Sequence, residues 1–448
     1  MSVEQREREK SKASTTNSKE WLTKDATYLA PAYARCFDLV AERAEGTYIY
    51  DLEGNRFIDF TMGIGVNNVG HCHPEVVKAT TEQIGKLIHC SSVTRHTMNI
   101  RLAEKIADIA PGRLDCVFLN NSGGEAVDAA VKMARYVTGR PNIVSFTGAF
   151  HGRTLLATAL TTAKAHYREG YDPLPSGIYQ IPYPYCLRCP VNQVPGKCEL
   201  ECFELVERLF DYQVKPQTVA AIIMEPVLGE GGYVVPATGY TKQNGFMKRL
   251  RQLCDEHGIL LIFDEVQSGF GRTGKWFACQ HWDVEPDVMI VAKGIASGFP
   301  MAGIISRKEL MDKWTVGRHG STYGGNPVAC AAALASIKVI EEGKLLDNAT
   351  RMGEYLQARL GELAKRYPFI GEVRGLGLMI GVEVVDEKGK ADGARLSRLV
   401  DACFQRRLLL LDCGSKDHII RFIPPLNVTK EQIDDALQVF EQALESVK

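Results

Sequence analysis

Residues 258–274, GILLIFDEVQSGFGRTG, decide the fold because an unbroken apolar run ends there at two acidic residues, Asp264 and Glu265. An apolar run of strand length without polar alternation indicates a strand that is covered on both faces, as in a parallel α/β sheet. Similar runs recur along the chain, with helical patterns between them, at residues 116–119, 142–146, 220–224, 288–292 and 303–306. We therefore expect an α/β fold with one large, mainly parallel central sheet covered by helices.

A second stretch, DVMIVAKGIASGFPMAG at residues 287–303, places Lys293 directly after another apolar run. Ligands of open α/β sheets bind beyond the carboxyl ends of the strands, so Asp264 and Lys293 are both placed to contact one ligand. A lysine there is costly unless it is paired or covalently engaged. Pyridoxal 5'-phosphate requires such a pair, because the lysine binds its aldehyde and the acid keeps its ring nitrogen protonated. For Asp264 alone, the alternative is a cap on the next helix.

The pattern changes after Asn326, where a smaller unit begins. We expect helices at about residues 327–341 and 351–366, a strand at 378–384 and a closing helix from Glu431. Residues 47–60, with a turn at 52–55, predict a hairpin that belongs to the same unit. The expected organisation is a flexible tail at residues 1–20, a large cofactor-binding domain at residues 71–325, and a discontinuous smaller α/β domain at residues 21–70 and 326–448.

The sequence NNSGGEAVDAAVKMARYVTG, residues 120–139, provides a candidate phosphate site at Ser122, Gly123 and Gly124. These residues open a helical pattern, and backbone N–H groups at a helix start bind anions. The alternative, an ordinary N-cap with an acidic first turn, fits the same letters almost as well. The sequence lacks the Lys-Ser/Thr ending of a nucleotide-triphosphate loop and the spacing of a dinucleotide fingerprint, which argues against those ligands.

The overall composition restricts the partners. The chain has 448 residues, 45% of them hydrophobic, and a net charge of -1, so no strong field attracts nucleic acid or an anionic membrane. The first twenty residues mix acidic and basic side chains without an apolar run, and no apolar window is long enough to span a bilayer. We expect a cytoplasmic protein whose partners are small molecules and a second copy of itself.

Further strings in the same order complete a family pattern: VGHCHPEV, NSGGEAVDAAVKMAR, GAFHGRT, EPVLGEGGYVVP, GSTYGGNPVACAAAL and VRGLGLMIGVE. From about Tyr28 to the end, the sequence resembles the 4-aminobutyrate aminotransferase group within the class III aminotransferases. This resemblance implies the fold type I architecture of pyridoxal-phosphate enzymes. It also implies a homodimer, with the site built at the subunit interface.

The resemblance assigns roles to individual residues. It implies that Lys293 is the Schiff-base lysine and that Asp264 is the partner of the pyridine nitrogen. It implies that the backbone amides of Gly123 and Gly124 bind the phosphate, together with Thr322 of the neighbouring subunit. It also implies that Phe150, where many relatives carry Tyr, stacks on one face of the cofactor ring and that Val266 packs on the other. Gln267 is implied to contact the phenolic oxygen.

Two arginines suggest the substrate. Arg421 lies in the apolar run HIIRFIPPL, where an unpaired guanidinium is unfavourable, so we expect it to meet a carboxylate. By resemblance, Arg421 binds the α-carboxylate of 2-oxoglutarate or glutamate and Arg153 binds the distal carboxylate. Glu230 resembles the acid that covers Arg421 when an amine without an α-carboxylate is bound. The alternative for either arginine is a buried structural ion pair.

Some positions depart from the family pattern. Leu228 stands where many relatives have Gln, and the loop serine, Ser122, lies two places before its usual position with Gly124 in its stead. Phosphate contacts are therefore expected to shift slightly. His151 is expected to be a packed or supporting residue rather than an acid–base catalyst, because Lys293 already moves the proton.

A cluster of cysteines has no place in this chemistry. Cys186, Cys189, Cys198 and Cys202 lie within one segment, in a spacing typical of zinc or iron–sulfur sites. Some aminotransferases of this group are thought to hold an iron–sulfur cluster through such a pair. We favour a structural disulfide or free thiols and assign no metal site.

The expected reaction is the ping-pong transfer of a primary amine from an ω-amino acid, 4-aminobutyrate in the first place, to 2-oxoglutarate. The alternative on the same scaffold is a racemase or aminomutase, in which Lys293 returns the proton to the same substrate. A more remote alternative is a non-catalytic dimer organised by the cysteine cluster. The identity of the amine donor is beyond the sequence.

Overall fold

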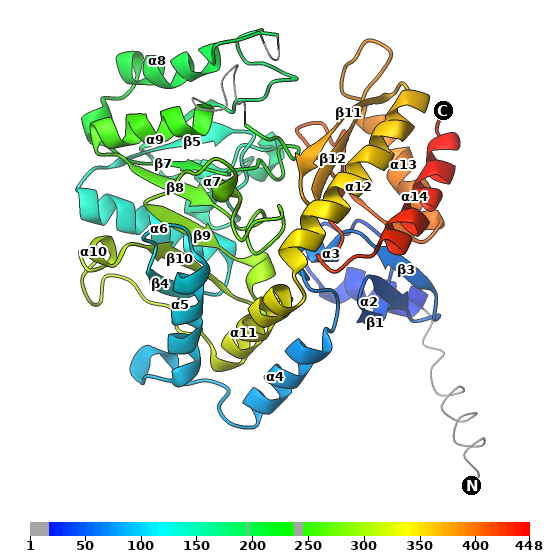
Figure 1. Cartoon of the computed structure of the whole chain (residues 1–448), viewed down its shortest axis with the longest axis horizontal. Coiled ribbons are helices and arrows are strands. Elements are labelled where there is room, and N and C mark those ends of the chain that lie inside the picture. The colour runs from blue at the N-terminus through cyan, green and yellow to red at the C-terminus, as the bar shows by residue number, and fades with distance from the viewer. Residues whose placement is uncertain (1–17, 195–196, 237–244) are drawn as a thin grey trace.

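A computed structural model describes residues 18–194, 197–236 and 245–448. Most of the expected tail at residues 1–20 therefore lies outside the described residues, and its last three residues begin helix α2 (Ser18–Tyr28). The chain forms a large α/β unit around one sheet, and a smaller unit built from both ends of the chain (Figure 1).

The central sheet has seven strands, and its fold class is the expected one. Its order is β4 (Cys116–Asn120), β10 (Ala302–Ser306), β9 (Val288–Val291), β8 (Leu260–Asp264), β7 (Val219–Met224), β5 (Asn142–Thr147) and β6 (Ile178–Pro182). The neighbours from β9 to β6 are parallel, whereas β10 runs antiparallel to both β9 and β4. An unbroken apolar run therefore indicated burial on both faces here but not direction. The mixed sequence IYQIP of β6 carried no such run and was not predicted.

Helices cover both faces of this sheet. In β7, Ala221 and Ile223 pack in one hydrophobic cluster with α6 (Gly123–Thr138), whereas Ile222 and Met224 pack in another cluster with α9 (Phe246–His257). Successive residues of a strand point to opposite faces, so a strand covered on both faces must be apolar throughout. The other helices of this unit are α4 (Pro74–Ile84), α5 (Thr97–Ile109), α7 (Leu155–Leu160), α8 (Glu204–Tyr212) and α10 (Lys308–Met311).

The smaller unit contains two four-stranded sheets. One has the order β11 (Ile370–Leu376), β12 (Met379–Val384), β15 (Ile419–Phe422) and β14 (Leu411–Cys413). The other joins the two ends of the chain, since β1 (Ala41–Glu45), β2 (Tyr48–Asp51) and β3 (Arg56–Asp59) continue into β13 (Leu408–Leu409), which is parallel to β3. The hairpin predicted at residues 47–60 corresponds to β2 and β3.

Helices complete the smaller unit and connect it to the large one. They are α3 (Met62–Gly65), α11 (Pro327–Glu342), α12 (Leu345–Arg366), α13 (Gly393–Gln405) and α14 (Lys430–Glu445). Helix α12 begins six residues before the start expected at residue 351, because the apolar positions Leu345 and Ala349 are buried in its first turns. Among the described residues, no helix combines the length and apolarity needed to cross a bilayer.

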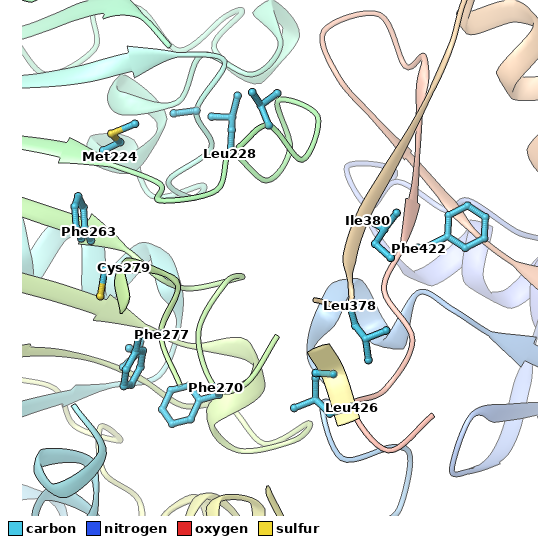
Figure 2. Packing of buried hydrophobic residues seen from close by; sticks show 14 of the residues in the cluster. Met224, Leu228, Phe263, Phe270, Phe277, Cys279, Leu378, Ile380, Phe422 and Leu426 are labelled. Atoms are coloured by element: carbon cyan, nitrogen blue, oxygen red, sulfur yellow. The ribbon is translucent and has the colours of Figure 1, made fainter. Parts of the chain in front are cut away.

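One hydrophobic cluster extends from the large unit into the smaller one. It includes Phe263 and Phe270 on one side and Leu378 and Phe422 on the other (Figure 2). Leu426 lies between these groups in the same view and belongs to the same cluster. Continuous packing of this kind fixes the position of the smaller unit relative to the strand ends of the central sheet.

Candidate active site

Lys293 and Asp264 lie at the carboxyl ends of neighbouring parallel strands. Asp264 is the last residue of β8 and is in register with Ile290 of β9. Lys293 follows β9 closely and begins a short 3-10 turn, Lys293–Ile295. Its φ of 47° lies in the left-handed region. A non-glycine residue held in this region costs on the order of 1–3 kcal/mol, and such residues cluster at functional sites.

The electrostatic environment of Lys293 disfavours the ammonium form. Burial, followed by the positive charge of Arg421, lowers the pKa of Lys293 to about 8, against the opposing charges of Glu225, Asp264 and Glu230. An exposed lysine has a pKa of about 10.4. These charges act on Lys293 because the fold brings Asp264, Arg421 and Glu230 near it, although the four residues are far apart in sequence.

Asp264 is held in place by two contacts. The imidazole Nδ1 of His151 donates to Oδ2 of Asp264 at 2.7 Å, and the backbone N–H of Val266 donates to Oδ1 at 3.1 Å. Both the His151 and Asp264 side chains are buried. His151 therefore supports Asp264, in agreement with the supporting role expected from the sequence.

Glu225 fixes the loop that carries Phe150. Its Oε1 accepts a hydrogen bond from the N–H of Phe150 at 2.8 Å, and its Oε2 accepts one from Gly229 at 2.9 Å. Burial raises the pKa of Glu225, and the nearby Asp264 carboxylate adds to the rise while His151 opposes it. Sequence reasoning quoted Glu225 as the first residue of the string EPVLGEGGYVVP but assigned it no role.

Ser122, Gly123 and Gly124 lie at the start of α6, as the sequence predicted. The hydroxyl of Ser122 accepts from the N–H of Glu125 at 3.3 Å, so Ser122 is the N-cap of α6, which agrees with the alternative interpretation of this sequence. A Cβ added at Gly123 would lie 3.4 Å from the side chain of Val266. A Cβ at Gly152 would lie 2.9 Å from the Cα of Gly124, so these two backbones approach closely.

Several features of this region fit pyridoxal phosphate. The Oε1 atom of Gln267, the Nε2 atom of His151 and the Nε atom of Arg421 are buried without a hydrogen-bond partner in the described part of the chain. Buried polar atoms without partners are rare in folded proteins and call for a ligand or water. An amine with a lowered pKa, a fixed carboxylate and a glycine-rich helix start are the groups that this cofactor requires.

Arg421 is paired with Glu230. Its Nη1 atom donates to Oε2 of Glu230 at 2.9 Å, and both side chains are largely buried. Burial raises the pKa of Glu230, but Arg421 and then Lys164 lower it by more, so the net shift is downward. The second oxygen of Glu230 meets Lys164 and Tyr167, which sequence reasoning did not identify.

Arg153, unlike Arg421, is not paired with a carboxylate among the described residues. Its side chain is exposed, and within the described ranges it forms no ion pair. The guanidinium carbon lies 3.9 Å from the ring centroid of Tyr167 and 5.5 Å from that of Phe150. The rings of Phe150 and Tyr167 meet edge to face at 5.6 Å. Arg153 is therefore positioned by aromatic rings and keeps its hydrogen-bond donors for another partner.

Thr322 lies between α10 and α11 in the chain. It is exposed in the loop before α11, and in the part of the chain that the structure describes its hydroxyl has no hydrogen-bond partner. The preceding residue, Ser321, accepts a hydrogen bond from Nδ2 of Asn121 at 3.1 Å, so this loop contacts the residue before Ser122.

The four clustered cysteines surround a small cavity with a volume of about 10 Å³, lined by Cys186, Cys189, Cys198 and Cys202. All four are free thiols. Burial, followed by the neighbouring thiols, raises the pKa of Cys202 to about 12. Within residues 18–194, 197–236 and 245–448, no group of three or more His, Cys, Asp or Glu side chains is arranged to hold a metal ion.

Comparison with known proteins places the chain in a family. Residues 28–444 match the family described as Aminotransferase class-III. The chain is 42% identical to 5-aminovalerate aminotransferase of Pseudomonas aeruginosa over 91% of this chain and 94% of that protein. It is 39% identical to 4-aminobutyrate aminotransferase of Escherichia coli over 96% of this chain and 99% of that protein.

The similarity extends to a racemase and to solved structures. An alanine/serine racemase of Pyrococcus horikoshii is 41% identical, over 92% of this chain and 86% of that protein. The structure of an (S)-enantioselective omega-transaminase from Thermomicrobium roseum superposes with a TM-score of 0.87 at 33% identity, covering 97% of this chain and 99% of that one. The chain therefore belongs to the class III aminotransferases and is a transaminase that depends on pyridoxal phosphate.

Proposed function

We propose that the protein transfers the primary amine of an ω-amino acid to 2-oxoglutarate in two successive half-reactions, with 4-aminobutyrate as the proposed donor. The observation that carries this proposal is the Arg421–Glu230 ion pair beside Lys293. An arginine that an internal carboxylate can cover suits two kinds of substrate, one with an α-carboxylate and one without. Relatives named for 4-aminobutyrate and 5-aminovalerate support the choice of donor.

Lys293 is the proposed catalytic residue. The cofactor, when bound, supplies an electron-withdrawing ring that stabilises negative charge on the substrate carbon. Lys293 attaches the cofactor and, once released, its Nζ takes the proton from the amine-bearing carbon of the donor. With a pKa of about 8, a useful fraction of this amine is unprotonated near neutral pH.

The remaining contacts position the ring and the phosphate. Asp264, held by His151, is proposed to keep the ring nitrogen protonated. Phe150 and Val266 are proposed to sandwich the ring, and Gln267, whose Oε1 is buried without a partner among the described residues, to contact the phenolic oxygen. The proposed phosphate contacts come from the start of α6, at Ser122, Gly123 and Gly124.

The two arginines are proposed to select the substrates. The distal carboxylate of either substrate binds Arg153, which has no ion pair within the described residues. The α-carboxylate of 2-oxoglutarate binds Arg421 bidentately after Glu230 has moved away. A donor such as 4-aminobutyrate has no α-carboxylate, so Glu230 stays on Arg421 and neutralises it.

We also propose a homodimer that completes each site. The proposed interface patch consists of five exposed apolar side chains, Ile84, Leu87, Ile88, Val93 and Tyr323. Its two segments are joined by a hydrogen bond from Asn326 Nδ2 to the carbonyl oxygen of Ile88 at 2.8 Å. Exposed apolar patches commonly mark protein interfaces. Thr322 lies beside Tyr323 and is proposed to reach the phosphate in a second copy of the chain.

The test is a panel of half-reactions. Purified protein would be mixed with 4-aminobutyrate, 5-aminovalerate, ornithine or alanine, and the change in cofactor absorbance would be followed. We expect the ω-amino acids to react and the Lys293→Ala variant to react at least about 100-fold more slowly. No reaction with any ω-amino acid would contradict the proposed donor class.

A racemase is the second candidate, because an alanine/serine racemase is among the relatives. It would interconvert L- and D-alanine without consuming a keto acid. Chiral chromatography of alanine after incubation, with and without 2-oxoglutarate, separates the two functions. Racemisation that needs no keto acid, together with no product from ω-amino acids, would replace the proposed function.

A further inference from the structure

Glu230 is shared between two cations. Its Oε2 atom accepts from Arg421 Nη1 at 2.9 Å, whereas its Oε1 atom faces Lys164 Nζ at 3.2 Å and accepts from the hydroxyl of Tyr167 at 3.0 Å. The Lys164 side chain is only 9% exposed, and that of Glu230 is 14% exposed. The contact with Arg421 therefore uses only one oxygen of the carboxylate, and a second cation holds the other.

The backbone around Glu230 is fixed. The carbonyl oxygen of Glu230 accepts from the N–H of Gly414 at 2.8 Å, and that of Gly232 accepts from Nε of Arg374 at 2.9 Å. A Cβ at Gly231 would collide with the carbonyl oxygen of Gly148, so the loop is packed closely against its neighbour. Because the backbone is held, we expect Glu230 to leave Arg421 by rotation of its side chain, with its Oε1 atom still at Lys164.

Lys164 is itself held in place. Its Nζ forms a second, short ion pair with Asp417, whose backbone N–H donates to the carbonyl oxygen of Gly414 at 3.1 Å. Lys164 and Glu230 are thus tied to the same loop through Asp417 and Gly414. Burial lowers the pKa of Lys164, but Asp417 and Glu230 outweigh it, so the pKa is raised and the residue stays charged in the working pH range.

An unpaired carboxylate in a largely buried place is expensive, whereas one that keeps a cation and a hydroxyl donor is not. We propose that Lys164 holds Glu230 after an α-carboxylate has replaced it on Arg421, and thereby sets the preference of the site for 2-oxo acids over amines that lack an α-carboxylate. Lys164 is a positioning residue, since it acts on the substrate through Glu230. This inference rests on the proposed function, in which Arg421 receives the α-carboxylate.

The test compares Lys164→Met, which removes the charge, with Lys164→Arg, which keeps it. Lys430→Met is the matched control, because Lys430 pairs with Asp434 on the exposed surface of α14. Each variant would be titrated by calorimetry with glutarate, a dicarboxylate that cannot react. The KM for 2-oxoglutarate and the half-reaction rate with 4-aminobutyrate would be measured on the same preparations.

For Lys164→Met we expect glutarate affinity to fall and the KM for 2-oxoglutarate to rise on the order of five- to tenfold, the size of a partly screened charged contact. The 4-aminobutyrate half-reaction should change by less than about twofold, because Glu230 then stays on Arg421. Lys164→Arg should restore the acceptor affinity, and Lys430→Met should match the wild type. Tyr167→Phe, which keeps the ring under Arg153, should also raise the KM for 2-oxoglutarate by more than it changes the half-reaction rate with 4-aminobutyrate.

The inference would be overturned if Lys164→Met changed the KM for 2-oxoglutarate and the half-reaction rate with 4-aminobutyrate by equal factors, or changed neither. The proposed function would remain intact in both cases. Failure of Lys164→Arg to restore glutarate affinity would overturn it as well. If the wild type neither bound glutarate nor reacted with 4-aminobutyrate, the proposed function would fail and this inference with it.

Discussion

The contact between His151 and Asp264 allows a quantitative prediction about cofactor binding. In His151→Phe, a ring of similar size fills the same space but cannot donate the 2.7 Å hydrogen bond to Oδ2 of Asp264. His151 is 3% exposed and Asp264 is 4% exposed, so water cannot replace the lost donor. Among the described residues, the hydrogen bond that remains to the carboxylate is the 3.1 Å bond from the backbone N–H of Val266.

The expected loss follows from the size of this contact. A hydrogen bond to a charged group contributes about 1.5–3 kcal/mol, and the low end of this range corresponds to roughly a tenfold change in an equilibrium constant. We take the low end, because Asp264 in the variant can relax partly before the cofactor binds. The dissociation constant for pyridoxal phosphate should therefore rise about tenfold or more.

The assay is a titration of the apoprotein with pyridoxal phosphate, followed by cofactor absorbance. His281→Phe is the control, because the Nε2 of His281 forms its hydrogen bonds, in the described part of the chain, with the carbonyl and hydroxyl oxygens of Thr273 rather than with a carboxylate. In an Asp264→Asn background, the effect of His151→Phe should shrink, since the two side chains act as a unit. A dissociation constant within twofold of the wild type, in a variant with an unchanged near-ultraviolet spectrum, would refute this reasoning.

Two further predictions concern Lys293 and the proposed interface. Because burial and Arg421 lower the pKa of Lys293, acylation of this amine in the apoprotein should rise with pH through a midpoint of about 8. Quantitative peptide mass spectrometry measures the extent of acylation. A midpoint near the ordinary lysine pKa of about 10.4 would contradict the environment assigned to Lys293. Ile88→Asp, in the proposed interface patch, should dissociate the proposed dimer in sedimentation experiments and weaken cofactor binding, whereas Tyr212→Asp, at an even more exposed residue of α8, should do neither. A dimer that survived Ile88→Asp would show that the interface lies elsewhere.

The sequence was sufficient to predict most strands of the central sheet and the positions of Asp264 and Lys293 at its strand ends. The runs before Asp264 and Lys293 are apolar throughout because helices cover both faces of β8 and β9, and burial on both faces is visible in sequence as an absence of alternation. The helix start at Ser122 and the hairpin of β2 and β3 were predictable for a similar reason, since capping residues and turns act within a few residues.

The sequence was less informative about the direction of strands and about pairing between strands that are far apart in the chain. β10 is buried throughout, like the parallel strands β8 and β9, yet it runs antiparallel to both of its neighbours. Its sequence cannot distinguish the two directions, because both bury the same side chains. β13 has two residues and forms only because β3, from the other end of the chain, lies beside it. Neither property leaves a periodic pattern in the local sequence.

The electrostatic arrangement of the site was decided by the tertiary structure alone. Lys164, Glu230, Asp417 and Arg421 come from three separate parts of the chain, and only folding brings their charges within contact distance. Local sequence patterns indicate the burial of each segment, because burial constrains neighbouring residues together. The partner of a charge depends on distance in space, which adjacent residues do not encode. The sequence therefore predicts Lys293 and Asp264 as the reacting groups, whereas the fold determines which charges surround them.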